Sequence, residues 1–196
     1  MKTVQMVSLI VLLSVCSLTA LPQRKNREAV HKYLLLATTK TSTMQKELDE
    51  ASARGYRVLV GSQASRNEMA LFLELVAKPP EIFSYKLLAT TLTSTMEREL
   101  NKMAGEGFRL LPHTMMAKRQ LLGPNEGVVL LERPPKVEKQ YEYKLLATRR
   151  TATMQTEASD AFAAGFVLVG MVSRGEHMVI MEKETDARLR TYPNSR

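Results

Sequence analysis

Tyr85-Lys-Leu-Leu-Ala-Thr90 is the most informative stretch of the sequence, because the chain contains it three times with little change. The other two copies are Tyr33-Leu-Leu-Leu-Ala-Thr38 and Tyr143-Lys-Leu-Leu-Ala-Thr148. In every copy a Met follows eleven residues after the Tyr, and a Gly follows eleven residues after that Met; these are Met44 and Gly55, Met96 and Gly107, Met154 and Gly165. Such constant spacing indicates one folding unit that is present three times in tandem.

Each copy predicts the order strand, helix, strand, strand. In the middle copy, the strand Tyr85–Thr90 runs into the hydroxyl-rich segment Thr91-Leu-Thr-Ser-Thr95, where a helix is expected to start. Thr41, Thr93 and Thr151 occupy the same place in the three copies and are predicted to be the helix N-caps. Ser94-x-x-Glu97 also matches the capping-box pattern.

Each predicted helix has one apolar face, with residues spaced at i, i+4, i+7 and i+8. In the third copy an Ala replaces the second residue of the face and a Phe replaces the fourth, which predicts that core volume is conserved there. The three faces are Met44, Leu48, Ala51 and Ser52; Met96, Leu100, Met103 and Ala104; and Met154, Ala158, Ala161 and Phe162.

Glycine is expected to end each helix in the left-handed conformation, at Gly55, Gly107 and Gly165. An aromatic residue follows each glycine, begins the second strand and is expected to fold over the helix end; these are Tyr56, Phe108 and Phe166. A hairpin then leads to the third strand, predicted at 71–76, 128–133 and 178–183.

The third strands are apolar on both faces, since Val128 and Leu130 alternate with Val129 and Leu131. A single helix covers one face of a small sheet, so something else must cover the other face. Units of about fifty residues are also marginal alone. We therefore predict an α+β fold of three tandem βαββ units in one compact pseudo-threefold body, packed sheet against sheet or joined at their edges; a self-associating dimer is the alternative.

The domain boundaries follow from these copies and from the proline pairs at 79–80 and 134–135. The predicted segments are a signal peptide (1–20), an N-terminal linker (21–32), βαββ units (33–78, 85–133 and 143–184) and a polar tail (185–196).

The first twenty residues have the order of a secretory signal peptide. Met1-Lys2 is basic, 7–15 is an apolar run too short for a comfortable membrane span, and Ala20 is a small residue suited to cleavage. A periplasmic or secreted protein is therefore expected, with no transmembrane segment in the mature chain. The single cysteine, Cys16, follows Leu13-Ser-Val, so attachment of a lipid to Cys16 is the alternative.

The formal net charge is +8. The basic residues are scattered, and export would remove the chain from most nucleic acid, so no nucleic-acid partner is expected. The charge is consistent with a basic surface in water or with attraction to an anionic envelope component.

Part of this pattern resembles a bacterial family known as domain of unknown function 4177. The resemblance rests on Tyr-x-Leu-Leu, the amphipathic helix and the stretch Leu100-Asn-Lys-Met-Ala-Gly-Glu-Gly-Phe-Arg-Leu110, followed by a strand that ends Leu130-Leu-Glu-Arg133. It covers residues 33–78, 85–133 and 143–183. Tyr or Phe stands where that family often has Trp, and the resemblance implies no activity.

The threonine turns are the strongest candidate for a binding site. Their hydroxyls would lie beside unpaired amides at the helix starts, where an anion can bind, although Thr also caps helices and closes turns. The candidates are Thr41, Thr43, Thr93, Thr95, Thr151 and Thr153. A second candidate is the insertion of the middle copy, where Leu121 and Leu122 on a hairpin tip would contact a partner, or would be a tolerated insertion.

Other chemistry-bearing residues form no recognisable pattern. Glu74, Glu132 and Glu182 recur at the third strands, and Glu47, Glu99 and Glu157 recur on the helices, which predicts solvated or ion-paired acids. His31, His113 and His177 have no ligand spacing, so no metal or cofactor is predicted.

The sequence thus favours an exported, non-enzymatic binding or interaction protein of the bacterial envelope, with a protein or an anionic component as partner. A small-ligand or anion-binding protein that uses the threonine turns is the second hypothesis. An enzyme with a site assembled between copies is the third.

Overall fold

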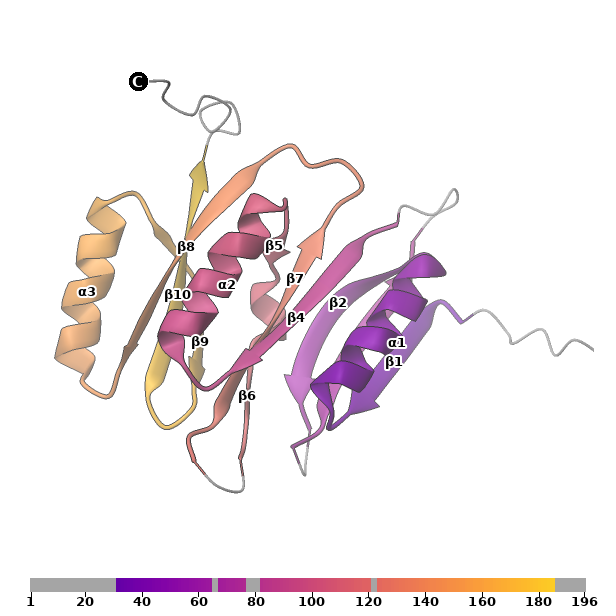
Figure 1. The fold of residues 1–196 in the computed structure, drawn as a ribbon, viewed down its shortest axis with the longest axis horizontal. Coiled ribbons are helices and arrows are strands. Elements are labelled where there is room, and N and C mark those ends of the chain that lie inside the picture. The colour runs from indigo at the N-terminus through magenta and orange to yellow at the C-terminus, as the bar shows by residue number, and fades with distance from the viewer. Residues whose placement is uncertain (1–30, 65–66, 77–81, 121–122, 186–196) are drawn as a thin grey trace, which may run out of the picture. The chain divides into compact units, whose positions relative to one another are not determined.

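The computed structural model describes residues 31–64, 67–76, 82–120 and 123–185. This part of the chain contains three helices and ten strands, and the strands form three antiparallel sheets. The fold is therefore α+β and mostly β (Figure 1). The predicted signal peptide with Cys16, most of the linker, the loop residues Leu121 and Leu122, and the tail from 186 onward lie outside the described residues. No helix in the described ranges is long and apolar enough to cross a bilayer.

The elements form three series with the same order, which we call the first, second and third unit. The first contains β1 (Tyr33–Thr38), α1 (Thr41–Ala53), β2 (Tyr56–Gln63) and β3 (Met69–Leu75). The second contains β4 (Ser84–Thr90), α2 (Thr93–Gly105), β5 (Arg109–Leu110), β6 (Met116–Lys118) and β7 (Glu126–Arg133). The third contains β8 (Gln140–Thr148), α3 (Thr151–Ala163), β9 (Val167–Ser173) and β10 (His177–Thr185).

The last strand of each unit is central in its sheet. The strand orders are β1-β3-β2, β4-β7-β5 with β6 also on β7, and β8-β10-β9. In the second unit the strand after the helix is split into β5 and β6 by a short 3-10 turn that begins at Pro112. Proline has no N–H for the ladder, which accounts for the break.

The predicted glycine stops are confirmed. Gly55, Gly107 and Gly165 have φ of 89°, 87° and 89°, in the left-handed region. The N–H of Phe108 donates to the carbonyl of Met103 (3.0 Å), which satisfies one of the last helical carbonyls. Phe108 itself is buried, as its place after the glycine predicts.

The predicted helix caps are wrong. Thr41, Thr93 and Thr151 are the first helical residues, and the preceding N-cap residues make no side-chain capping hydrogen bond. The threonine that ends each preceding strand serves the turn instead, because its Oγ1 lies close to the backbone N–H two residues later. Thr90 Oγ1, for example, accepts from the N–H of Leu92 (3.2 Å).

The apolar faces of the first two helices are confirmed residue by residue, since the four predicted residues of α1 and the four of α2 are buried. The two faces of β7 also contribute to different cores. Val128 and Leu130 pack with the first unit, and Val129 and Leu131 pack with α2. Both faces of a third strand are therefore covered, as the apolar alternation predicted.

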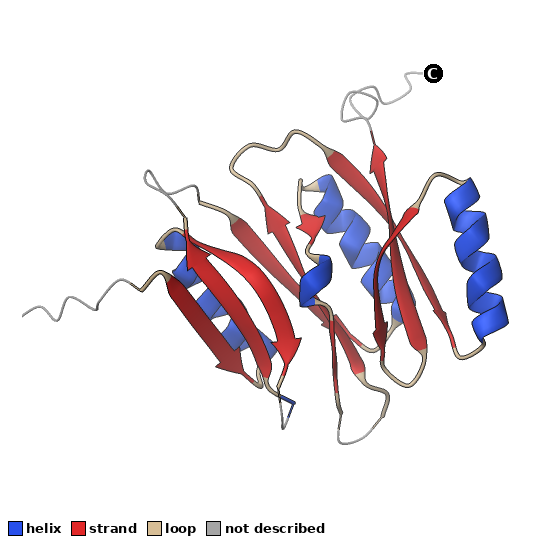
Figure 2. Ribbon diagram, turned by 180° about the vertical axis from the view of Figure 1, so that it is seen from behind, coloured by secondary structure: helices blue, strands red, loops and turns tan. Residues whose placement is uncertain are grey.

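The units pack in series. α1 contacts β4 as well as its own sheet, and α2 contacts β8 as well as its own sheet, so α1 and α2 each lie between two sheets (Figure 1). The three sheets remain separate, which rules out the alternative of one sheet joined at its edges (Figure 2). This arrangement does not confirm the predicted pseudo-threefold body.

The predicted face of the third helix is confirmed in part. Ala161 is buried, and Met154 and Ala158 are half-buried against the same core, whereas Phe162, which was expected to fill the core, is exposed. The physical reason is the serial packing, because α1 and α2 are covered on their far side by the sheet of the following unit. No fourth sheet follows α3 in the described residues.

Candidate functional site

The helix of one unit packs against the sheet of the next unit, and we call this contact a joint. The first joint lies between the first and second units. β4 lies at the edge of its sheet, and an edge strand exposes unpaired backbone groups. The side chain of Gln45 on α1 covers this edge by donating from Nε2 to the carbonyl of Tyr85 (3.0 Å). Its Oε1 accepts from the N–H of Leu87 (2.8 Å). One amide side chain therefore pairs with the strand much as a further strand would.

The joint between the second and third units repeats this arrangement on β8. Glu97, at the helical position equivalent to Gln45, accepts from the N–H of Leu145 (2.8 Å). Asn101 donates to the carbonyl of Tyr143 (2.8 Å) and accepts from its N–H (2.9 Å). This use of Glu97 also explains why the capping box is not formed, because its carboxylate is bonded to the next sheet.

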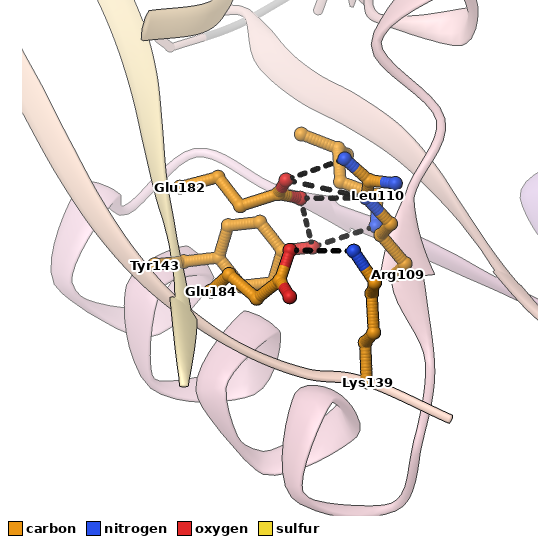
Figure 3. A network of polar contacts seen from close by, with 6 residues as sticks. All are labelled: Arg109, Leu110, Lys139, Tyr143, Glu182 and Glu184. Atoms are coloured by element: carbon orange, nitrogen blue, oxygen red, sulfur yellow. Dashed lines mark hydrogen bonds and ion pairs between the residues drawn. The ribbon is translucent and has the colours of Figure 1, made fainter. Parts of the chain in front are cut away.

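An ion pair between a buried glutamate and a half-exposed arginine links the two units at each joint. Arg109 on β5 forms a salt bridge with Glu182 on β10 (2.8 Å), and the hydroxyl of Tyr143 donates to the same carboxylate (2.9 Å) (Figure 3). The Tyr143 hydroxyl also accepts from the backbone N–H of Leu110 (2.8 Å). The bond to Glu182 raises the pKa of the Arg109 guanidinium, and burial raises the pKa of the Tyr143 hydroxyl.

The first joint has the same cluster, with Arg57, Glu132, Tyr85 and Val58 in the corresponding places. Glu132 and Glu182 are therefore ion-paired, as predicted, but they are buried rather than solvated. The sequence placed them correctly on the strands, yet it could not show that an arginine from the preceding unit would cover them.

The third unit carries the helix side of such a joint, and none of the described residues covers it. The groove lies over α3 and β9 and has a volume of about 600 Å³. Phe162 is 69% exposed and Leu168 is 59% exposed, whereas Ala104 and Leu110, at the equivalent positions of the second unit, are each 1% exposed. The groove is lined mainly by Met154, Gln155, Ala158, Phe162, Leu168 and Met171.

The first unit carries the sheet side of a joint. This surface is the face of its sheet that is turned away from α1. Tyr33 is 49% exposed and Leu35 is 53% exposed, whereas Tyr85, the equivalent of Tyr33 in the second unit, is 4% exposed. Phe72 pairs across the sheet with Leu35 and is exposed as well. The described part of the chain thus has two uncovered apolar faces, and each matches one side of the internal joints.

The candidate threonines lie at three separate helix starts and are not brought together. Thr41 lines a hollow that also contains Lys86 of the second unit. Thr93 accepts a hydrogen bond from the guanidinium of Arg174 (2.7 Å). The third-unit pair, Thr151 and Thr153, is exposed, and Thr151 lines the groove. The remaining candidates, Thr43 and Thr95, are half-buried in the first turns of their helices.

Thr93 lies among side chains of both charges. The hollow that it lines contains the carboxylates of Glu97, Glu157, Asp160 and Glu176 together with Lys144, and the Thr93 hydroxyl is bonded to the Arg174 guanidinium. The excess of carboxylates in this hollow opposes an anion at this helix start. In the described ranges, no group of three or more His, Cys, Asp or Glu side chains lies close enough to hold a metal ion.

Sequence reasoning missed the groove, although the signal was present. Phe162 was the one large residue at a helical position where the other copies have Ser52 and Ala104. A large apolar residue at such a position indicates an exposed contact surface as readily as a core, because no further copy follows the third one within the described residues.

No protein-family model matches the chain, and no curated protein or solved structure is significantly similar to it. The resemblance to domain of unknown function 4177 therefore remains a prediction.

Proposed function

We propose that this chain is an exported, non-enzymatic interaction protein of the bacterial envelope that binds a protein partner through the groove over α3 and β9. The observation that carries the proposal is the exposure of Phe162, Leu168 and Met171 side by side in one groove. Large contiguous apolar surfaces on a monomer are typical of sites that bind another macromolecule.

The chemistry of the groove favours a protein over an anionic polymer. Its lining is mainly methionine, leucine, alanine and phenylalanine. Its polar groups are Thr151, Gln155, Ser159 and His177, and no lysine or arginine of the described residues lines it. Aromatic and methionine side chains are enriched in protein interfaces. Gln155 supplies both a donor and an acceptor, which suits a partner that presents the backbone of an extended strand.

Site-specific photo-crosslinking in the cells that naturally produce the chain tests this proposal. A photoreactive phenylalanine analogue in place of Phe162 should give a discrete adduct. The same analogue in place of Lys46, which is exposed on the outer side of α1, serves as the control and should give none. Equal yields of adduct at the two positions, or no adduct at position 162, would contradict a binding role for the groove.

Export is a part of the proposal that rests on the order of residues 1–20. Intact-mass analysis of the protein isolated from those cells tests it. Removal of the signal peptide predicts a chain that begins at Leu21, and lipid attachment predicts a chain that begins at Cys16 and carries acyl groups. A mature protein that retains Lys2 would exclude both routes.

A further inference from the structure

We infer that the groove of the third unit binds the open sheet face of the first unit of a second copy of this chain, so that copies associate head to tail. This inference rests on the proposed function and specifies its partner. The two uncovered faces are not arbitrary apolar surfaces, because the chain itself already joins such faces twice, at α1 with β4 and at α2 with β8.

The polar contacts of the internal joint have their counterparts at the two ends. Gln155 on α3 occupies the position of Gln45 on α1 and is the same residue type. In the internal joint Gln45 bonds the N–H of Leu87 and the carbonyl of Tyr85. Leu35 and Tyr33 are the equivalents of these residues on β1, which is likewise an edge strand. Gln155 of one copy therefore matches the β1 edge of another copy without any change of chemistry.

One apolar contact of the internal joint is matched in volume at the two ends. Leu100 of the second helix and Ile180 of the third sheet lie in the same core cluster. At the ends of the chain, Ala158 takes the place of Leu100, and Phe72 takes the place of Ile180. At this position the groove has a smaller side chain and the incoming face a larger one, whereas one turn further along α3 Phe162 stands in place of Ala104 and adds volume to the groove. Exchanges that conserve total volume are the ones that packed interfaces tolerate best.

One contact of the internal joints is missing from the joint between copies. Val167 stands where the first and second units have Arg57 and Arg109, so Glu74 of the incoming copy would meet no arginine. Glu74 is held instead by Lys32 of its own unit (3.2 Å). We therefore expect an association that is weaker than the internal joints and that depends on concentration.

The two faces are different surfaces, so the contact is heterologous. A head-to-tail contact leaves one free face of each kind, and copies add until a ring closes or a filament grows. A symmetric dimer, in contrast, would bury two identical faces and stop at two copies.

Light scattering after size exclusion, on protein expressed from the full sequence, separates these cases. The variant Leu35→Glu blocks the sheet face, and the variant Phe162→Glu blocks the groove; both residues are exposed, so both variants should keep the circular dichroism spectrum of the parent. The parent should form species larger than a dimer as concentration rises. Each variant alone should remain a monomer, whereas an equimolar mixture should give a dimer, because each variant retains the half that the other lacks.

The variant Val167→Arg provides a gain-of-function test. It supplies the missing partner of Glu74, and the dissociation constant between copies should fall about tenfold. Adding Glu74→Gln to this variant should remove the gain.

Specific outcomes overturn the inference. A monomeric parent at all concentrations, a dimer formed by either blocked variant alone, or a mixture of the two that stays monomeric would each exclude head-to-tail binding. The crosslinking experiment distinguishes this failure from failure of the proposed function. An adduct at position 162 with a different protein would leave the groove a binding site while excluding a second copy as its partner.

Discussion

Gln45 on α1 accepts a hydrogen bond from the backbone N–H of Leu87 on β4 (2.8 Å), which ties the helix of one unit to the edge strand of the next. Leu87 N–H would otherwise lie on an unprotected sheet edge. The joint between units therefore covers strand edges and also forms an apolar core.

Replacing Gln45 with Ala should lower the free energy of unfolding by about 1 to 2 kcal/mol, because two hydrogen bonds to a half-buried strand edge are lost. Urea denaturation monitored by circular dichroism measures the change. Gln155→Ala is the matched control, since Gln155 is exposed in a single chain and should change the stability of the dilute protein by less than about 0.5 kcal/mol. Equal losses in the two variants would show that the joint does not depend on this contact.

Replacing Glu182 with Gln should cost about 2 kcal/mol of stability. The substitution removes the charge that pairs with Arg109, but it leaves an oxygen for the hydroxyl of Tyr143. The cost is below that of a fully buried pair, because the Arg109 side chain is 54% exposed and water can solvate it.

Glu74→Gln is the corresponding change in the first unit, where the acid is paired with the exposed Lys32. Its cost should not exceed about 0.5 kcal/mol, as is typical of surface pairs. A smaller loss for Glu182→Gln than for Glu74→Gln would contradict a structural role for the buried cluster.

Stability should fall in alkali because burial raises the pKa of both Tyr85 and Tyr143. In the unfolded chain a tyrosine loses its proton at a pKa of about 10, while the folded chain keeps the proton until higher pH. The contribution of each tyrosine is complete below pH 10 and decreases above it, by about 1.4 kcal/mol per pH unit for each group.

Chemical denaturation at several pH values between 9 and about 11.5 measures this slope. Tyr143→Phe should reduce the slope of the free energy of unfolding above pH 10 by the contribution of one tyrosine, whatever the substitution does to stability at pH 7. A slope that is unchanged in Tyr143→Phe would show that this hydroxyl ionises equally in the folded and unfolded chains.

Gly107 and Gly105 should respond in opposite directions to alanine. Gly107 has φ of 87°, and an added Cβ would lie 2.7 Å from a Cγ atom of Val137, so Gly107→Ala should destabilise the fold by about 1 to 2 kcal/mol or more. Gly105 ends α2 with open space around it, and Gly105→Ala should stabilise the fold by up to about 1 kcal/mol. Thermal melts of the two variants provide the comparison, and a stabilised Gly107→Ala would contradict the left-handed helix stop.

The buried helix faces and the helix ends could largely be predicted from the sequence, because they depend on residues that are close together in the chain. The spacing of Met96, Leu100, Met103 and Ala104 identified the buried face of α2, and Gly107 identified its end. The alternation on β7 indicated that both sheet faces would be covered.

How the units pack against one another could not be predicted from the sequence, because this packing depends on contacts between residues that are far apart in the chain. Glu97 was assigned to a capping box, but its carboxylate bonds Leu145, which is 48 positions away in the chain. Phe162 was predicted to lie in a core. The equivalent position of α2 does lie in a core, but only because the sheet of a further unit packs over α2. Periodicity identifies which residues share a face, but it does not show whether anything covers that face.

Residue-resolved amide hydrogen exchange of Leu35, Leu87 and Leu145 tests the central claim, that the first and last units carry the two open halves of a joint formed twice within the chain. In dilute protein, exchange should be slow at Leu87 and Leu145, whose N–H groups are bonded to the preceding helix, and fast at Leu35. Raising the concentration should slow exchange at Leu35 towards the rates of the other two. Protection of Leu35 in dilute monomer, or fast exchange at Leu35 in associated protein, would show that the first and third units do not carry matching open surfaces.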